Sequence, residues 1–156
     1  MGEMGVGVPE CAGRFFDRKL ALTMEKKEVL SGYTWAAILL ILGITTGAFG
    51  AHALEGVLDV KGKESWATAA HYALVMGSAT LAAAATGRTR GIGWVQSGVA
   101  LFSGSIFLLI CARLNGWPIQ AWVGPFTPAG GLLMIVGWLL WLMALRRPGK
   151  SKGSQR

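Results

Sequence analysis

The chain has 156 residues, of which 53% are hydrophobic and 15% are charged, and its 15 Lys and Arg residues outnumber 8 Asp and Glu. Soluble domains carry about 25% charged residues, so this composition excludes an ordinary soluble domain. The length suits one compact unit. The basic residues lie in short segments beside apolar runs, which favours contact with lipid headgroups over binding to nucleic acid.

Residues 1–32 form a polar N-terminal extension of mixed charge, which we expect to be loosely ordered. The extension lacks the apolar core of a signal peptide. Met24, followed by EKKEV, is an alternative translation start to Met1.

The first long apolar run covers residues 34–54, which include no Asp, Glu, Lys or Arg. A helix rises about 1.5 Å per residue, so this run spans roughly 30 Å, the thickness of the bilayer hydrocarbon core. Three further runs follow, at residues 65–86, 92–112 and 128–145. Thr127 and Pro128 are typical of an N-cap and first turn at the start of the last run. We therefore predict an all-α, polytopic membrane protein, with a four-transmembrane-helix bundle over residues 33–146 and a basic C-terminal tail over residues 147–156.

The distribution of basic residues predicts the orientation. Twelve of the 15 Lys and Arg residues lie before the first run, between the second and third runs, or after the fourth. Only Lys61, Lys63 and Arg113 lie in the other two connections. By the positive-inside rule, both termini are cytoplasmic.

Small residues recur every four positions in the first two runs, and residues at this spacing share one helix face. They are Gly43, Gly47 and Ala51 in the first run and Ala69, Ala73 and Gly77 in the second. Small side chains let helices approach closely in a membrane, so we interpret both rows as helix-packing surfaces. A substrate groove along the glycines is the alternative.

Few residues in the apolar runs could carry out chemistry. His52 and His71 are the only ionisable candidates for coupled transport there, and both lie toward the outer ends of their runs. An intramembrane serine hydrolase could use Ser105 and His71, but no acidic residue accompanies them except near the surface. Cys11 and Cys111 lack metal-ligand spacing, and no phosphate-loop, haem or zinc motif is present. We expect no enzymatic activity and no cofactor.

A polar cluster is predicted at the outer end of the bundle, where the first three runs and the start of the fourth converge. Its members are His52, Glu55, His71, Arg113, Asn115 and Thr127. Buried polar groups need partners, so these side chains could form a structural clasp that seals the bundle. The alternative is a binding site for a small anion or headgroup, with Arg113 supplying charge and the imidazoles adding pH dependence.

Four segments carry a resemblance to a known family: GAFGAHAL (residues 47–54), TAAHYALV (68–75), LFSGSIFLL (101–109) and GPFTPAGGLLMIVGW (124–138). They resemble the domain-of-unknown-function 423 family, which includes the animal transmembrane protein 256, over about residues 35–145. The resemblance implies a four-helix, multi-pass membrane protein, in bacteria one of the inner (plasma) membrane, and implies no activity. The family often has a histidine a few residues beyond the tyrosine that matches Tyr72, where this chain has Met76.

Two functions of different classes follow. The first is a non-catalytic membrane component or accessory subunit, whose partners are the lipid bilayer and other membrane subunits or further copies of the chain. The second is a small-solute or ion permease or channel subunit, which would work as an oligomer because four short helices leave little room for a pathway.

Overall fold

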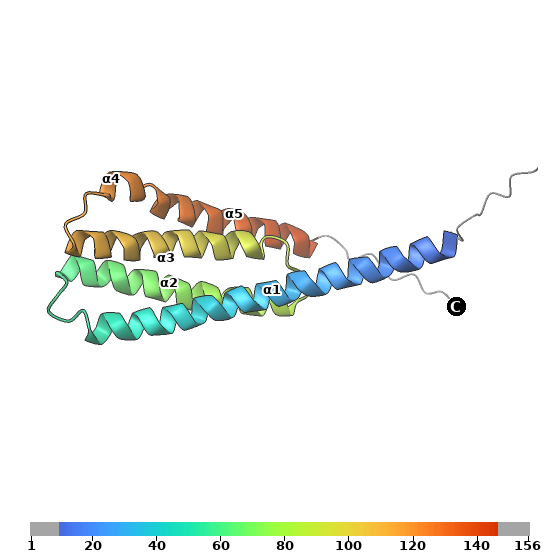
Figure 1. Ribbon diagram of the computed structural model, residues 1–156, viewed down its shortest axis with the longest axis horizontal. Helices are drawn as coiled ribbons and strands as arrows, with labels where there is room; N and C mark the ends of the chain where they lie inside the picture. Colours follow the sequence, from blue (N-terminus) through green and yellow to red (C-terminus); the bar gives the residue numbers. More distant parts are fainter. Residues whose placement is uncertain (1–9, 147–156) are drawn as a thin grey trace, which may run out of the picture.

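The computed structural model describes residues 10–146, and every regular element in this range is a helix. In chain order the elements are α1 (Glu10–His52), α2 (Val60–Ala85), α3 (Ile92–Leu114), the short α4 (Gln120–Val123) and α5 (Phe126–Arg146) (Figure 1). The predicted all-α fold is therefore confirmed. Residues 1–9 and 147–156 lie outside the described residues, as do the start of the predicted N-terminal extension and the C-terminal tail.

α1 starts much earlier than the first apolar run predicts. Residues 10–32, expected to be loosely ordered, are helical and continue into the apolar part without a break. They contain no Pro and are rich in Leu, Ala, Glu and Lys, which favour helix. The N-terminal part of α1 projects beyond the other helices (Figure 1).

α2 also starts earlier than predicted, because Asp59 caps it. The Asp59 carboxylate accepts a hydrogen bond from the backbone N–H of Gly62 at 2.9 Å, which satisfies a first-turn donor. The helix therefore begins at Val60 and includes the charged Lys61, Lys63 and Glu64, which lie before the predicted run of residues 65–86.

Three helical segments are long and apolar enough to cross a membrane, judged by length and composition: Leu22–His52, Ile92–Leu114 and Gln120–Arg146. α2 does not meet the same measure. These segments support a membrane protein. Four spans and two cytoplasmic termini remain a prediction.

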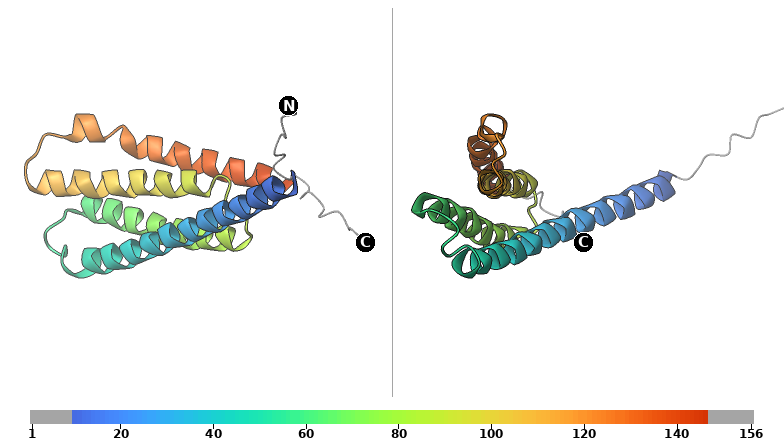
Figure 2. Two further views of the ribbon diagram at one scale, coloured as in Figure 1. Left: turned by 45° about the vertical axis from the view of Figure 1, so that its right-hand side comes forward. Right: turned by 60° about the vertical axis from the view of Figure 1, so that its left-hand side comes forward.

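α3 lies at the centre of the arrangement. α1 packs along α2, α2 along α3, and α1 also touches α3. α5 packs along α3 on the side away from α1 (Figure 2). The main core cluster joins all four long helices through Leu39, Ala73, Val95, Val99 and Met134. One side of α3 stays uncovered between α1 and α5, and Gly93, Trp94, Ser97, Ala100 and Gly104 are exposed there.

Glycines set the close approach of α3 and α5. A Cβ on Gly98 would lie 2.7 Å from the Gly130 carbonyl oxygen, and a Cβ on Gly130 would lie 2.6 Å from the Phe102 backbone nitrogen. A turn or two away, a Cβ on Gly137 would lie 2.7 Å from the Val95 nitrogen. The two backbones are therefore in contact, which only glycine permits at these positions.

Candidate functional site

Helix α3 makes a polar contact with each of its three long neighbours. The Gln96 Nε2 donates to the Gly32 carbonyl of α1 at 2.8 Å, and the Ser103 hydroxyl donates to the Ala69 carbonyl of α2 at 2.8 Å. The Ser105 hydroxyl lies 2.7 Å from the Thr127 hydroxyl of α5. All three α3 side chains are buried.

We call the bonds of Gln96, Ser103 and Ser105 to neighbouring helices the α3 polar contacts. The sequence does not identify these three residues as contacts between helices. Serine in a membrane helix can return its hydrogen bond to its own backbone, and Ser105 does so to the Phe102 carbonyl at 2.9 Å. Nothing in the sequence tells which hydroxyls also reach another helix. A buried Gln between apolar residues was the available signal, because its amide needs a partner.

Trp66 makes a further link between α1 and α2. Its indole Nε1 donates to the Thr46 carbonyl at 2.7 Å, and its ring lies 4.6 Å from the Phe107 ring, centroid to centroid. A Cβ on Gly50 would collide with the Trp66 ring, so the glycine makes room for the indole. The buried Trp66 packs between the α1–α2 connection and the C-terminal part of α3, and so joins α1, α2 and α3 at this end of the bundle.

The predicted packing residues fall along the α1–α2 contact to different extents. A Cβ on Gly43 would lie 2.9 Å from the Leu74 backbone nitrogen, and one on Gly77 would lie 3.2 Å from the Leu40 nitrogen. Ala69 and Ala73 are buried. By contrast, a Cβ on Gly47 would meet only the Ala70 Cβ, at an ordinary van der Waals distance of 3.9 Å, and Ala51 is exposed. A substrate groove cannot pass Gly43 and Gly77, because the neighbouring helix fills the space beside both glycines.

Three members of the predicted polar cluster bond elsewhere. The Arg113 guanidinium pairs with the Asp59 carboxylate at 3.1 Å, and both side chains are more than half exposed. The Asn115 amide donates to the Cys111 carbonyl of its own helix at 2.8 Å. Thr127 bonds to Ser105.

The other three members do not bond to one another. His52, Glu55 and His71 are exposed, and none has a hydrogen-bond partner among the described residues. Glu55 and His71 line one surface hollow of about 440 Å³ together with Lys63 and Trp66, whereas His52 lies outside its lining. The six residues therefore do not form one cluster. Asp59, which caps α2 and binds Arg113, connects the helix ends instead.

The structure does not support a metal site or the Ser105–His71 hydrolase pair that the sequence raises. Among the side chains that the structure describes, no group of three or more His, Cys, Asp or Glu is placed to hold a metal ion. The Ser105 hydroxyl is engaged by Thr127, and the hollow that His71 lines does not include Ser105.

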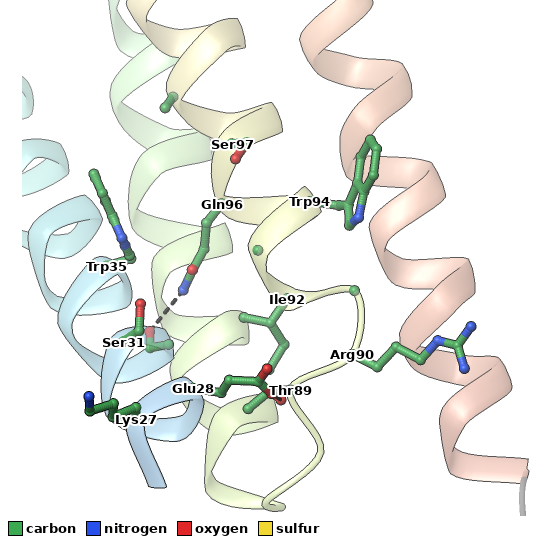
Figure 3. A pocket seen from close by; sticks show the side chains of 14 residues that line it. Lys27, Glu28, Ser31, Trp35, Thr89, Arg90, Ile92, Trp94, Gln96 and Ser97 are labelled. Carbon is green, nitrogen blue, oxygen red and sulfur yellow. Dashed lines mark hydrogen bonds between the residues drawn. The ribbon is translucent and has the colours of Figure 1, made fainter. Parts of the chain in front are cut away.

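A larger hollow lies at the opposite end of the helices, between α1 and the start of α3. It measures about 810 Å³. We call it the basic hollow; its charged and aromatic lining residues are Lys27, Glu28, Trp35, Arg90 and Trp94 (Figure 3). Lys27 and Trp35 stand on the α1 flank, and Arg90 and Trp94 stand on the flank toward α5 (Figure 3). Gln96, already bonded to Gly32, contributes to its lining.

Comparison with known proteins places this arrangement among membrane proteins. Residues 46–131 match the family model described as "Protein of unknown function (DUF423)". The chain is 34% identical to a UPF0382 membrane protein of Staphylococcus haemolyticus over 114 residues, covering 69% of this chain and 88% of the relative. It is 36% identical to a UPF0382 membrane protein of Schizosaccharomyces pombe over 113 residues, covering 69% and 95%. The corresponding Bacillus subtilis protein is 32% identical over 116 residues, covering 69% and 89%. No solved structure matches.

Proposed function

Because the chain belongs to the DUF423 family of membrane proteins, we propose that it is a non-catalytic component of a bacterial inner membrane. In this proposal the protein crosses the bilayer four times and acts as an accessory subunit through its helix surfaces. Its partners are the surrounding lipid and another membrane subunit.

The α3 polar contacts carry this proposal. Lipid tails give helices no hydrophobic reason to associate, so close packing and interhelical hydrogen bonds hold a membrane bundle together. Gln96, Ser103 and Ser105 each bond to a different neighbouring helix. The fourth buried polar side chain, Thr80, donates to the Gly77 carbonyl of its own helix at 3.1 Å. Three of the four buried polar side chains of the described helices thus bond across helices, which suits a structural component better than a catalyst or a conduction path.

The uncovered side of α3 offers a surface for a partner helix. Nothing lies within 4 Å of the position that a Cβ on Gly104 would take. Ala100 and Leu108, one turn away on either side, are exposed as well. A small residue on an exposed membrane helix lets a second backbone approach closely, which is the common basis of helix association in bilayers.

Co-purification of the tagged full-length protein in a mild detergent tests this proposal. We expect the wild type to bring down a membrane subunit in fixed stoichiometry and Gly104→Leu to lose it while keeping its melting temperature. Gly131→Leu on α5 is the matched control, because a Cβ at Gly131 also meets nothing within 4 Å. Purification of all three proteins as the same species without a partner would contradict an accessory role.

A further inference from the structure

We propose that the basic hollow binds the headgroup of an anionic phospholipid. The hollow lies between α1 and the start of α3, at the end of the helices where the α2–α3 turn and the C-terminus of α5 also lie (Figures 1 and 3). The described segments at this end carry the basic residues Lys26, Lys27, Arg88, Arg90 and Arg146. The inference goes beyond the accessory role proposed above and does not depend on a protein partner.

The charge of the lining points to a phosphate group. Lys27 and Arg90 stand on opposite flanks of the hollow, and neither forms an ion pair within residues 10–146. One acidic side chain, Glu28, also lines the hollow, and its carboxylate accepts a hydrogen bond from the Thr89 hydroxyl at 3.3 Å. Two cations and one carboxylate give the hollow a net positive charge, which attracts a phosphodiester. The Glu28 carboxylate can in addition accept a hydrogen bond from a headgroup hydroxyl.

Hydrogen-bond donors without partners surround the same space. The hydroxyls of Ser31 and Ser97 line the hollow and have no hydrogen-bond partner in the described part of the chain. Helix α3 starts after Gly91 without a side-chain cap, and the Ile92 N–H donates to the Thr89 carbonyl, so the N–H groups of Gly93 and Trp94 are the ones that stay available. Free N–H groups at a helix start favour a phosphate, and here they reinforce the two cations.

The aromatic residues identify a lipid rather than a free anion. Trp35 and Trp94 line the hollow and are 53% and 54% exposed. Tryptophan indoles concentrate at the level of the headgroups, where one part of the ring meets acyl chains and another meets water. Ala100, one turn beyond Gln96 and Ser97, continues the lining with an apolar side chain. Figure 3 shows the Arg90 guanidinium turned toward α5 and away from Lys27, so a phosphate would meet either cation at the rim of the hollow, with the first carbons of its acyl chains against indole and methyl groups.

The site meets the surface proposed for a partner helix at Ala100, but the centres of the two lie apart. Gly93 lines the hollow, and Gly104 lies 11 residues further along α3. At a rise of about 1.5 Å per residue, the two positions are about 16 Å apart. Loss of lipid and loss of a protein partner can thus be measured in different variants.

Lipid retention by the purified full-length protein tests the inference. The protein, in an uncharged detergent, is incubated with mixed micelles that contain dioleoyl phosphatidylglycerol or dioleoyl phosphatidylcholine, and the lipid that stays with it through gel filtration is counted. We expect the wild type to retain phosphatidylglycerol and little phosphatidylcholine. The variant carrying Lys27→Gln and Arg90→Gln should retain about tenfold less phosphatidylglycerol, because each basic residue near the headgroups contributes measurably to binding.

A charge-matched control separates the hollow from general surface charge. Lys26→Gln with Arg146→Gln removes the same charge from two exposed residues that do not line the hollow, and should leave retention unchanged. Gly93→Leu provides a variant that keeps all charges. Nothing lies within 4 Å of a Cβ at Gly93, so the leucine should fit the fold, occupy part of the hollow and lower retention.

Four results would overturn the inference. They are equal retention of the two lipids, equal loss in the hollow and control double variants, undiminished retention by Gly93→Leu, and release of bound phosphatidylglycerol by excess inorganic phosphate. The last result would assign the hollow to a free anion. Thermal melting of each variant shows that lost retention does not come from unfolding.

Discussion

The side-chain amide of Gln96 on α3 donates a hydrogen bond to the main-chain carbonyl of Gly32 on α1 over 2.8 Å. These residues lie on helices that otherwise touch over a short length, since α1 packs mainly along α2. Gln96 is only 6% exposed, so its amide cannot exchange this partner for water. The bond therefore ties α1 directly to the central helix.

Replacing this glutamine should weaken the bundle. Gln96→Leu keeps a similar volume but removes the donor, and interhelical hydrogen bonds in membrane proteins contribute about 0.6–2 kcal/mol. We expect a free energy of unfolding lower by about that amount, measured by unfolding in mixed micelles. An unchanged unfolding free energy would mean that the contact adds nothing to stability.

Two of the three serines of α3 offer a comparison with identical chemistry. Ser103→Ala removes the bond to the Ala69 carbonyl, and we expect it to lower stability by about 0.6 kcal/mol or more. Ser97→Ala removes an exposed hydroxyl without a partner in the described residues, and stability should stay within about 0.5 kcal/mol of the wild type. Equal effects of the two substitutions on the unfolding free energy would contradict this account of α3.

The glycines of α3 should respond to alanine in opposite directions. A Cβ on Gly98 would meet the Gly130 carbonyl oxygen at 2.7 Å, so α5 must shift, and Gly98→Ala should cost about 1–3 kcal/mol. Gly104→Ala meets open space and should be neutral or stabilise the helix by up to about 1 kcal/mol. Thermal melting in one detergent compares the pair, and a destabilising Gly104→Ala together with a neutral Gly98→Ala would show that α5 packs elsewhere.

The predicted topology can be tested with single cysteines in a background where Cys11 and Cys111 are replaced by serine. Lys61→Cys should react with an impermeant thiol reagent in intact cells, and Gly149→Cys should react only after the membrane is opened. This result follows from the concentration of basic residues at one end. Labelling of position 149 alone would reverse the orientation, and labelling of both positions would contradict four spans.

The sequence predicts the long helices well because apolar runs and their charged flanks are local features. It places helix starts poorly where tertiary or capping contacts decide them. The α2 start depends on the Asp59 carboxylate, which accepts from Gly62 and also from Arg113. Because Arg113 bonds to Asp59, it does not bond to the other members of the predicted polar cluster. The position of Asp59 depends on the conformation of the α1–α2 loop, which residue spacing does not reveal.

Small residues spaced four apart predict helix contacts on α1 and α2. The α3–α5 contact uses glycines seven residues apart: Gly91, directly before α3, and Gly98 within it face Gly130 and Gly137 of α5. Seven residues make nearly two turns, so this spacing also keeps one face. In a chain with 23 glycines, spacing alone does not show which pairs meet.

The central claim is that the interior polar groups hold helices together and do not conduct. Ion and proton flux through liposomes that contain only the purified protein tests this claim most directly, with Gln96→Leu and Ser103→Ala as companions. We expect leakage equal to that of protein-free liposomes for all three proteins. Wild-type flux that rises with the amount of protein and disappears in Gln96→Leu or Ser103→Ala would contradict the claim and establish the permease or channel function instead.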